Sequence, residues 1–350
     1  MVLGCKVERP APYDHVSPPQ ACESVLESGS QPTTGTRVDV RVAAKVNLFL
    51  AVRGLRPDGY HELVSIMQTV SLKDSIVAEM DDAPANLHPA ARRHLHVEFS
   101  HDGTAGVPDD EDNLVLRAAK LLLKAIGGGD GTKRAGTHTV ATRLHLTKSI
   151  PVAGGMAGGS ADAAATLVAL NALWDGGLDR DELRDLGARL GADIPFCVTG
   201  GTALATGTGT ATAQVLCRGT FHWVVGMSDD PMSTPEVYRT FDEVGTPTEK
   251  EPDVVLQALR TGDADVLGAS LHNDLETATF HLRPALRDAR DAMLDAGALG
   301  AIVSGSGPTM IALAADKGQA RAIAEQVADR FDRVEVVTSP SGGPTVTMPH

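Results

Sequence analysis

Residues 151–165 read PVAGGMAGGSADAAA, a run of glycines and other small residues between two well-patterned segments. In residues 140–150 apolar side chains alternate with mostly polar ones, which is typical of a strand with one buried face. Residues 160–174 are rich in Ala and Leu and begin with a serine, which favours a helix N-terminus. A glycine loop between a strand and a helix offers unpaired backbone N–H groups and the positive end of a helix dipole. The stretch therefore predicts a phosphate-binding loop rather than a flexible linker, which would lack regular structure on either side.

Two familiar nucleotide-binding patterns do not match this loop. A Walker A loop needs a lysine directly before its serine or threonine, whereas Gly159 precedes Ser160 here. A dinucleotide-binding fingerprint needs a G-x-G start, which the run lacks. We therefore expect a phosphate-binding loop of another family.

The charge balance favours a small-molecule ligand. The chain has 350 residues, 42% of them hydrophobic, which is typical of a globular protein of one large or two modest domains. Its 45 acidic and 31 basic residues give a net charge of -14, which disfavours binding to nucleic acid or to an anionic membrane. No apolar run approaches the roughly 18 residues of a membrane span, and no signal-peptide core is evident. We expect a cytoplasmic protein.

Cysteine and histidine spacing does not indicate a metal site. Cys5, Cys22, Cys197 and Cys217 include no C-x-x-C pair, and the 12 histidines are scattered. We expect neither a disulfide nor a zinc site, and the sequence assigns no metal ligand.

Composition sets the two ends of the chain apart. Residues 1–36 are rich in Pro, Ser, Thr and Gln without an apolar period, which predicts a disordered extension. Residues 339–350 are rich in Gly and Pro, which predicts a flexible tail.

Two polar positions in the ordered part are candidates for chemistry. Residues 37–52 alternate as a strand, which predicts Lys45, Asn47 and Phe49 on one face and Val46, Leu48 and Leu50 on the other. Asp193 follows a predicted helix at 178–191. Taken singly, a strand lysine is usually a solvated charge and an aspartate after a helix is usually a turn residue. Their combination with the glycine loop favours an active site.

Several motifs in order carry a resemblance to a known family. The glycine loop is similar to the P-x-x-x-G-L-G-S/G-S-x-A loop of the GHMP kinases, the superfamily of galactokinase, homoserine kinase and mevalonate kinase. The branch that phosphorylates 4-diphosphocytidyl-2-C-methyl-D-erythritol is matched in the stretches AAKVNLFLAV (43–52), RPDGYHEL (56–63), GADIPFCVTGGTALATGTG (191–209), STPEVY (233–238), NDLE (273–276) and SGSGPTMIAL (304–313). The resemblance spans residues 38–337.

This resemblance implies an α+β fold of two lobes. The N-terminal lobe, residues 37–199, would be similar to ribosomal protein S5 and bind ATP, and the C-terminal lobe, residues 200–338, would be ferredoxin-like and bind the acceptor. The implied reaction moves the ATP γ-phosphate, with Mg²⁺, to the tertiary 2-hydroxyl of the methylerythritol, a step of the non-mevalonate isoprenoid pathway.

The resemblance also implies roles for individual residues. Asp193 is similar to the catalytic base and Lys45 to its cationic partner, a pairing that suits a hydroxyl of very high pKa. Asn47 would lie beside them, Tyr60 and Tyr238 would stack on the cytosine, and His61 would bind the cytosine edge. The loop expected to bind ATP comprises Pro151, Val152, Ala153, Gly154, Gly155, Met156, Ala157, Gly158, Gly159, Ser160 and Ala161.

One departure and three alternatives accompany this interpretation. Ala157 stands where the family loop often has glycine, so a positive φ there would strain the chain by about 1 kcal/mol. The alternatives are another GHMP kinase of the homoserine or mevalonate type, a catalytically silent nucleotide sensor on the same fold, and a nucleic-acid-binding protein. The GYHEL and STPEVY stretches argue against another GHMP kinase. The presence of Lys45 and Asp193 argues against a silent sensor, and the net charge argues against nucleic-acid binding.

Overall fold

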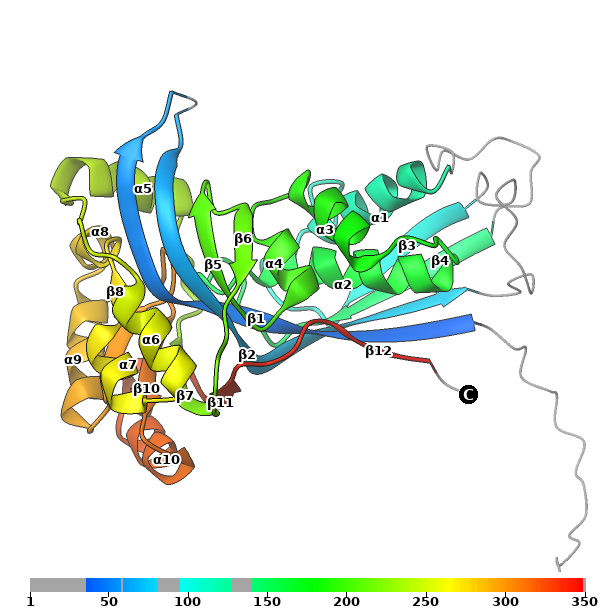
Figure 1. Ribbon diagram of the computed structural model, residues 1–350. Coiled ribbons are helices and arrows are strands. Elements are labelled where there is room, and N and C mark those ends of the chain that lie inside the picture. Colours follow the sequence, from blue (N-terminus) through cyan, green and yellow to red (C-terminus); the bar gives the residue numbers. More distant parts are fainter. Residues whose placement is uncertain (1–35, 58, 81–94, 128–139, 349–350) are drawn as a thin grey trace, which may run out of the picture. The chain divides into compact units, whose positions relative to one another are not determined.

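The computed structural model describes residues 36–57, 59–80, 95–127 and 140–348 (Figure 1). The predicted disordered extension, residues 1–36, lies outside the described residues except for Thr36, which begins the first strand.

The larger sheet contains eight strands, ordered β12-β1-β2-β4-β3, with β5 on β2, β6 on β5 and β8 on β1. Their bounds are β1 Thr36–Leu55, β2 His61–Met80, β3 Leu95–His101, β4 Val140–Thr147, β5 Thr202–Gly207, β6 Ala211–Gln214, β8 His272–Asn273 and β12 Thr345–Thr347. The β3–β4 and β1–β8 pairs are parallel and the others antiparallel. The two long strands β1 and β2 lie side by side (Figure 1), and residues of both line the site described below.

Four helices belong to the same part of the chain: α1 Leu114–Ala125, α2 Gly158–Leu173, α3 Arg180–Ala188 and α4 Ile194–Thr199. The predicted helix after the glycine loop is confirmed as α2, which packs on β1 and β2. Its small side chains are buried on every side, as expected for a helix that is apolar all round. The capping box of Asp179 and Glu182 at the start of α3 links each side chain to the other residue's backbone N–H.

The smaller sheet contains four antiparallel strands ordered β11-β7-β10-β9, with bounds β7 Phe221–Met227, β9 Gly300–Val303, β10 Met310–Ala314 and β11 Arg333–Ser339. In chain order this is fourth, first, third, second, with helices after the first and third strands, which is the ferredoxin-like arrangement. Its helical segments are α5 Thr234–Val244, α6 Asp253–Thr261, α7 Ala264–Ser270, α8 Glu276–Leu282, α9 Ala285–Asp295, α10 Lys317–Gln326 and η2 Ala328–Arg330. The predicted α+β class is confirmed.

Two details differ from the sequence prediction. The strands β5 and β6 follow residue 200 but pair with β2, so the smaller sheet begins only at Phe221. The tail predicted to be flexible from residue 339 instead forms β12, which pairs with β1 at Asp39–Arg41. The edge of β1 offers unpaired backbone groups there, and the tail satisfies them without needing an apolar face.

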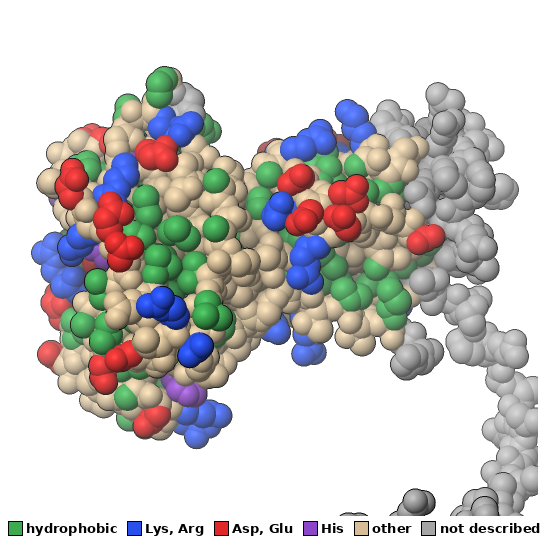
Figure 2. Space-filling model, in the orientation of Figure 1, with side chains coloured by type: hydrophobic (Ala, Val, Ile, Leu, Met, Phe, Trp, Pro, Cys, Tyr) green, Lys and Arg blue, Asp and Glu red, His purple; other side chains and the backbone are tan. Residues whose placement is uncertain are grey.

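Charged side chains of both signs are mixed on the face drawn in Figure 2. Such mixing does not provide the continuous basic track along which a nucleic-acid backbone binds. Among the helices of the described ranges, none combines the length and the apolar character needed to cross a bilayer.

Candidate active site

Two shifts in the pairing of β1 with β2 flank the polar residues of β1 that line a cavity. The pairing register of β1 with β2 shifts between Ala43 and Lys45 and again between Asn47 and Phe49. The second shift reverses the alternation, so Leu50 faces the same cavity as Lys45 and Asn47, whereas a regular strand would place it opposite. The predicted partnership of Phe49 with Lys45 and Asn47 is therefore wrong.

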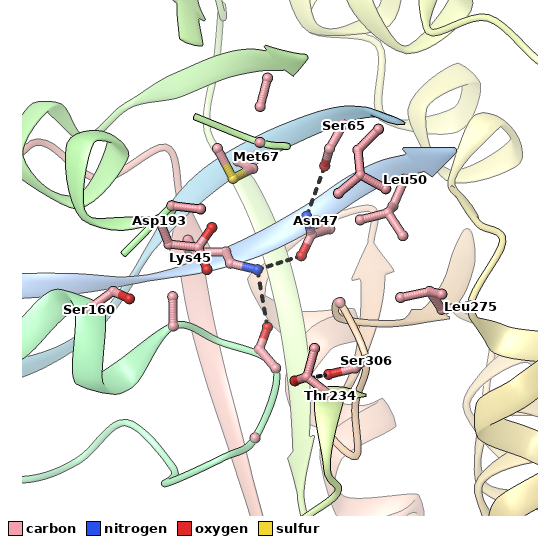
Figure 3. Close-up of a pocket in the computed structure, with 18 of the residues that line it drawn as sticks. Lys45, Asn47, Leu50, Ser65, Met67, Ser160, Asp193, Thr234, Leu275 and Ser306 are labelled. Atoms are coloured by element: carbon pink, nitrogen blue, oxygen red, sulfur yellow. Dashed lines mark hydrogen bonds between the residues drawn. The ribbon is translucent and has the colours of Figure 1, made fainter. Parts of the chain in front are cut away.

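The Lys45 ammonium is held by a short polar chain (Figure 3). Its Nζ donates to Asn47 Oδ1 at 2.7 Å and to the Gly155 carbonyl at 3.4 Å. Asn47 Nδ2 donates to Ser65 Oγ at 2.8 Å, and that hydroxyl donates to the Phe49 carbonyl at 2.8 Å. Lys45 is almost fully buried, and no carboxylate lies within ion-pair distance of it among the described residues. A buried cation without a salt bridge is well suited to a negatively charged ligand.

The glycine loop forms another wall of this cavity, which has a volume of about 430 Å³. The backbone N–H groups of Gly158, Gly159 and Ser160 make no hydrogen bond within the described residues, because they belong to the first turn of α2. The loop thus provides the free amides and the helix end that the sequence predicts for a phosphate site.

A second glycine turn, residues 304–307, packs directly against the first. A Cβ on Gly155 would lie 2.1 Å from the Ser304 carbonyl oxygen, so this position accepts only glycine. The Gly155 carbonyl also accepts a hydrogen bond from Ser304 Oγ at 3.1 Å. Gly155 is therefore required for contact between the two loops, whereas the amides of 158–160 remain available to a ligand.

Asp193 lines the cavity from the start of α4. It occupies the N-cap position of that helix with φ -82° and ψ -16°, but its side chain does not cap the helix. The carboxylate makes no hydrogen bond within the described part of the chain. Burial raises the pKa of Tyr238, and the charge of Asp193 contributes further to this rise. Asp193 is thus a free acceptor in the same cavity as Lys45 (Figure 3).

Ala157 adopts the conformation in which a glycine would be unstrained. Its φ of 56° and ψ of 36° lie in the left-handed region, which costs a residue with a side chain about 1 kcal/mol. The alanine methyl group does not close the cavity, because Ala157 itself is part of the lining.

The structure distributes the eleven predicted loop residues unequally. Ala153, Gly154, Gly155, Ala157, Gly158, Gly159 and Ser160 line the cavity. Met156 and Ala161 point into the core, and Pro151 and Val152 line a different cavity. Sequence reasoning missed Ser65, Met67, Thr234 and Ser306, which also line the site. Of these, Ser306 and Thr234 had a signal, because they belong to the SGSG turn and to the STPEVY stretch.

A second cavity of about 510 Å³ adjoins the first and contains the remaining predicted residues, Tyr60, His61 and Tyr238. The two cavities share Leu63, Thr208, Thr234 and Tyr238 as lining residues. The rings of His61 and Tyr238 stack with centroids 5.3 Å apart and an interplanar angle of 29°. The paired cavities therefore offer a polar end and an aromatic end to one ligand.

A buried charge cluster that the sequence did not suggest lies behind the glycine loop. Lys148 Nζ contacts Asp74 Oδ2 at 2.6 Å and Asp162 Oδ2 at 3.0 Å, and its side chain is only 2% exposed. Asp74 Oδ1 accepts the backbone N–H groups of Ser149 and Ile150, which enter the loop. The cluster thereby connects residues 148–150, which precede the glycine loop, to helix α2.

Asp162 accepts fewer hydrogen bonds than Asp74, the other acidic residue of this cluster. Its Oδ1 is buried without a hydrogen-bond partner within the described residues. Burial raises the pKa of Asp162 to about 8, against the opposing charge of Lys148, and the nearby Asp74 charge adds to the rise.

Replacing Asp162 by asparagine is expected to make the free energy of unfolding less dependent on pH. The folded protein holds a proton on Asp162 that the unfolded chain, with a carboxyl pKa of 3.8, has lost. Stability from this group is therefore highest near pH 4 and declines as the pH rises to about 8. In urea titrations from pH 5 to 8, the native protein should lose free energy of unfolding relative to Asp162→Asn, by at most about 1.4 kcal/mol per pH unit. The exposed Asp295→Asn is the control, and parallel curves for all three proteins would contradict the assignment.

The described residues contain no group of three or more His, Cys, Asp or Glu side chains that could hold a metal ion by themselves. Ser160 and Asp193 lie beside the free amides of the loop. Their side-chain oxygens could add ligands to a metal ion that is bound mainly by phosphate groups.

Two family models match this chain. The model of the GHMP kinases N terminal domain matches residues 113–201, and that of the GHMP kinases C terminal domain matches residues 255–333. The first match includes the glycine loop and Asp193.

Three known proteins are similar to this chain over most of its length. A 4-diphosphocytidyl-2-C-methyl-D-erythritol kinase of Salinispora tropica is 46% identical over 296 residues, covering 83% of this chain and 87% of the relative. A solved structure of 4-(cytidine 5'-diphospho)-2C-methyl-D-erythritol kinase matches with a TM-score of 0.67 and 33% identity, over 87% of this chain and all of that chain. A homoserine kinase from Cytophaga hutchinsonii has a TM-score of 0.66 at 19% identity, over 92% of this chain and all of that chain, and so shares the fold alone.

Proposed function

Since the chain belongs to the 4-diphosphocytidyl-2-C-methyl-D-erythritol kinases within the GHMP kinases, we propose that it transfers the γ-phosphoryl group of ATP to the 2-hydroxyl of that cytidine-linked acceptor. The observation that carries this proposal is the pair of adjoining cavities. The first contains the free amides, the buried Lys45 ammonium and the Asp193 carboxylate, and the second contains two tyrosines and a histidine. A long ligand with a base at one end and a hydroxyl at the other suits this arrangement. The use of ATP as phosphoryl donor is consistent with a location in the cytoplasm, where ATP is available.

Each group in the first cavity has a defined task in the transfer. The amides of Gly158, Gly159 and Ser160 bind phosphate oxygens of ATP, whose charge the helix end favours. Asp193 accepts the proton of the acceptor hydroxyl as the new O–P bond forms and the bond between the γ-phosphorus and the ADP leaving group breaks. Its lack of other hydrogen bonds leaves it free to do so. Lys45 stabilises the negative charge that develops on the acceptor and transferred oxygens. Asn47 and Ser65 hold the ammonium in place.

The proposal includes Mg²⁺, which neutralises phosphate charge when it is bound with ATP. In this role the metal takes most of its ligands from phosphate and water, so a protein cluster of three ligands is not required. Ser160 and Asp193 are two lining residues whose side-chain oxygens could hold it.

Replacing Tyr238 by alanine is expected to weaken acceptor binding without slowing the chemistry. Tyr238 is part of the wall shared by both cavities, and loss of a stacking face costs about 1 to 3 kcal/mol. The KM for the cytidine-linked acceptor should rise accordingly, while kcat and the KM for ATP stay near native. Tyr238→Phe keeps the ring and should bind normally. An unchanged KM in Tyr238→Ala would remove Tyr238 from base recognition.

The proposal is tested against its alternatives by offering three acceptors with ATP and Mg²⁺. We expect ADP formation with 4-diphosphocytidyl-2-C-methyl-D-erythritol and little with homoserine or mevalonate. Preference for either of the latter would indicate another GHMP kinase, and ATP binding without turnover on any acceptor would indicate a nucleotide sensor.

A further inference from the structure

His61 makes a hydrogen bond that limits what its ring can offer to a ligand. Its Nε2 lies 2.8 Å from Asp242 Oδ1, and the two side chains are 10% and 52% exposed. Asp242 and Tyr238 are one helical turn apart on α5, so one helix presents both the stacking partner and the hydrogen-bonding partner of His61. Helix α5 therefore fixes both the plane and the rotation of the imidazole.

The identity of the partner decides which nitrogen carries the hydrogen. An ionised carboxylate only accepts hydrogen bonds, so Nε2 must be the protonated nitrogen of the neutral ring. The other nitrogen, Nδ1, is then an acceptor. It makes no hydrogen bond to any other described residue, and His61 lines the aromatic cavity. This cavity thus contains a histidine available as an acceptor.

The two common pyrimidines differ in the group that such a nitrogen would meet. Cytosine carries an exocyclic amino group, a donor, where uracil carries a carbonyl oxygen, an acceptor. A ring nitrogen with a lone pair binds the amino group and is repelled by the carbonyl. A site that pairs with one group discriminates strongly against an analogue that cannot pair.

We propose that Asp242 is a positioning residue for base selection: by holding His61 as the Nε2–H tautomer, it makes Nδ1 an acceptor and favours a pyrimidine with an amino group over one with a carbonyl. The inference rests on the proposed function, because it assumes that the aromatic cavity receives the base. Asp242 also lines this cavity, and the role proposed for it is exercised through His61. It contributes selectivity between bases rather than rate.

The test compares binding of cytidine 5'-diphosphate and uridine 5'-diphosphate to the full chain by calorimetry. We expect the native protein to prefer the cytidine compound by roughly tenfold or more, as an unmatched polar pair costs about 1 to 3 kcal/mol. An asparagine can either accept from Nε2–H or donate to Nε2, so Asp242→Asn permits both tautomers. Its preference should fall to within about threefold, while kcat with the cytidine-linked acceptor stays within about twofold.

A matched control exists elsewhere in the chain. His101 Nε2 lies 3.0 Å from Asp109 Oδ1, the same type of pair, and neither residue lines the aromatic cavity. Asp109→Asn should leave the cytidine preference unchanged.

Nuclear magnetic resonance of nitrogen-labelled histidine provides a second, direct reading. The native His61 should show the Nε2–H tautomer, and Asp242→Asn should show a mixture. A native cytidine preference that persists in Asp242→Asn, or a native Nδ1–H tautomer, would overturn the inference while leaving kinase activity on the cytidine-linked acceptor intact. Failure of the native protein both to bind either diphosphate and to phosphorylate that acceptor would overturn the proposed function as well.

Discussion

Replacing Asp193 by asparagine is expected to lower kcat by about 10² to 10⁴-fold, the usual contribution of general acid–base catalysis. Asparagine keeps the shape of the side chain and can still bond the acceptor hydroxyl, but it cannot take the proton. The KM for ATP and for the acceptor should change little, because the lost interaction belongs to the transition state. Initial rates at saturating ATP and Mg²⁺ measure the effect.

The control for this variant is Asp229→Asn, since Asp229 lines a separate cavity that also contains Pro151 and Val152. It should retain native kcat. Unfolding curves should show that Asp193→Asn remains folded. Near-native turnover by Asp193→Asn would exclude Asp193 as the base, whereas a rise in KM with unchanged kcat would make it a binding residue.

Replacing Lys148 by methionine is expected to lower the free energy of unfolding by about 3 to 5 kcal/mol. Removing one member of a buried ion pair leaves uncompensated charge, and here the buried Asp74 carboxylate would lose its cation. The carboxylates of Asp162 and Asp74 raise the pKa of Lys148 against the effect of burial, which agrees with a cation that the fold requires. Urea unfolding at pH 7 measures the loss.

Lys120→Met provides the comparison, because Lys120 Nζ pairs with Glu111 Oε1 at 3.0 Å on the surface, with a side chain 52% exposed. That pair should contribute less than about 1 kcal/mol. Adding Asp74→Asn to Lys148→Met should recover part of the lost stability, since it removes the stranded charge. Equal losses in Lys148→Met and Lys120→Met would show that the buried cluster does not stabilise the fold.

The sequence predicted the parts of the site that depend on local pattern. The strand, glycine loop and helix at 140–174 are local, because alternation and small residues each act over a few positions. The serine expected to begin the helix, Ser160, instead lies in its first turn, and the N-cap is Ala157. The pairing of Lys45 with the loop came from the family resemblance and its order of motifs.

Features that depend on contacts distant in sequence could not be predicted in the same way. The bulge beside Asn47 moved Leu50 into the cavity and Phe49 out of it, because the register is set between β1 and β2. The cluster around Lys148 joins residues 74, 148 and 162, none of which is unusual in its own segment. The tail strand β12 had no apolar alternation to predict it, because its side chains are exposed and only its backbone pairs.

The most direct test of the account is the position of the new phosphate in the product. The purified chain is incubated with ATP, Mg²⁺ and 4-diphosphocytidyl-2-C-methyl-D-erythritol, and the product is examined by phosphorus and carbon magnetic resonance. The account predicts one new phosphomonoester, coupled to the tertiary carbon 2 of the methylerythritol, with the cytidine diphosphate link unchanged. A phosphate on any other hydroxyl, or ATP hydrolysis without a phosphorylated product, would contradict it.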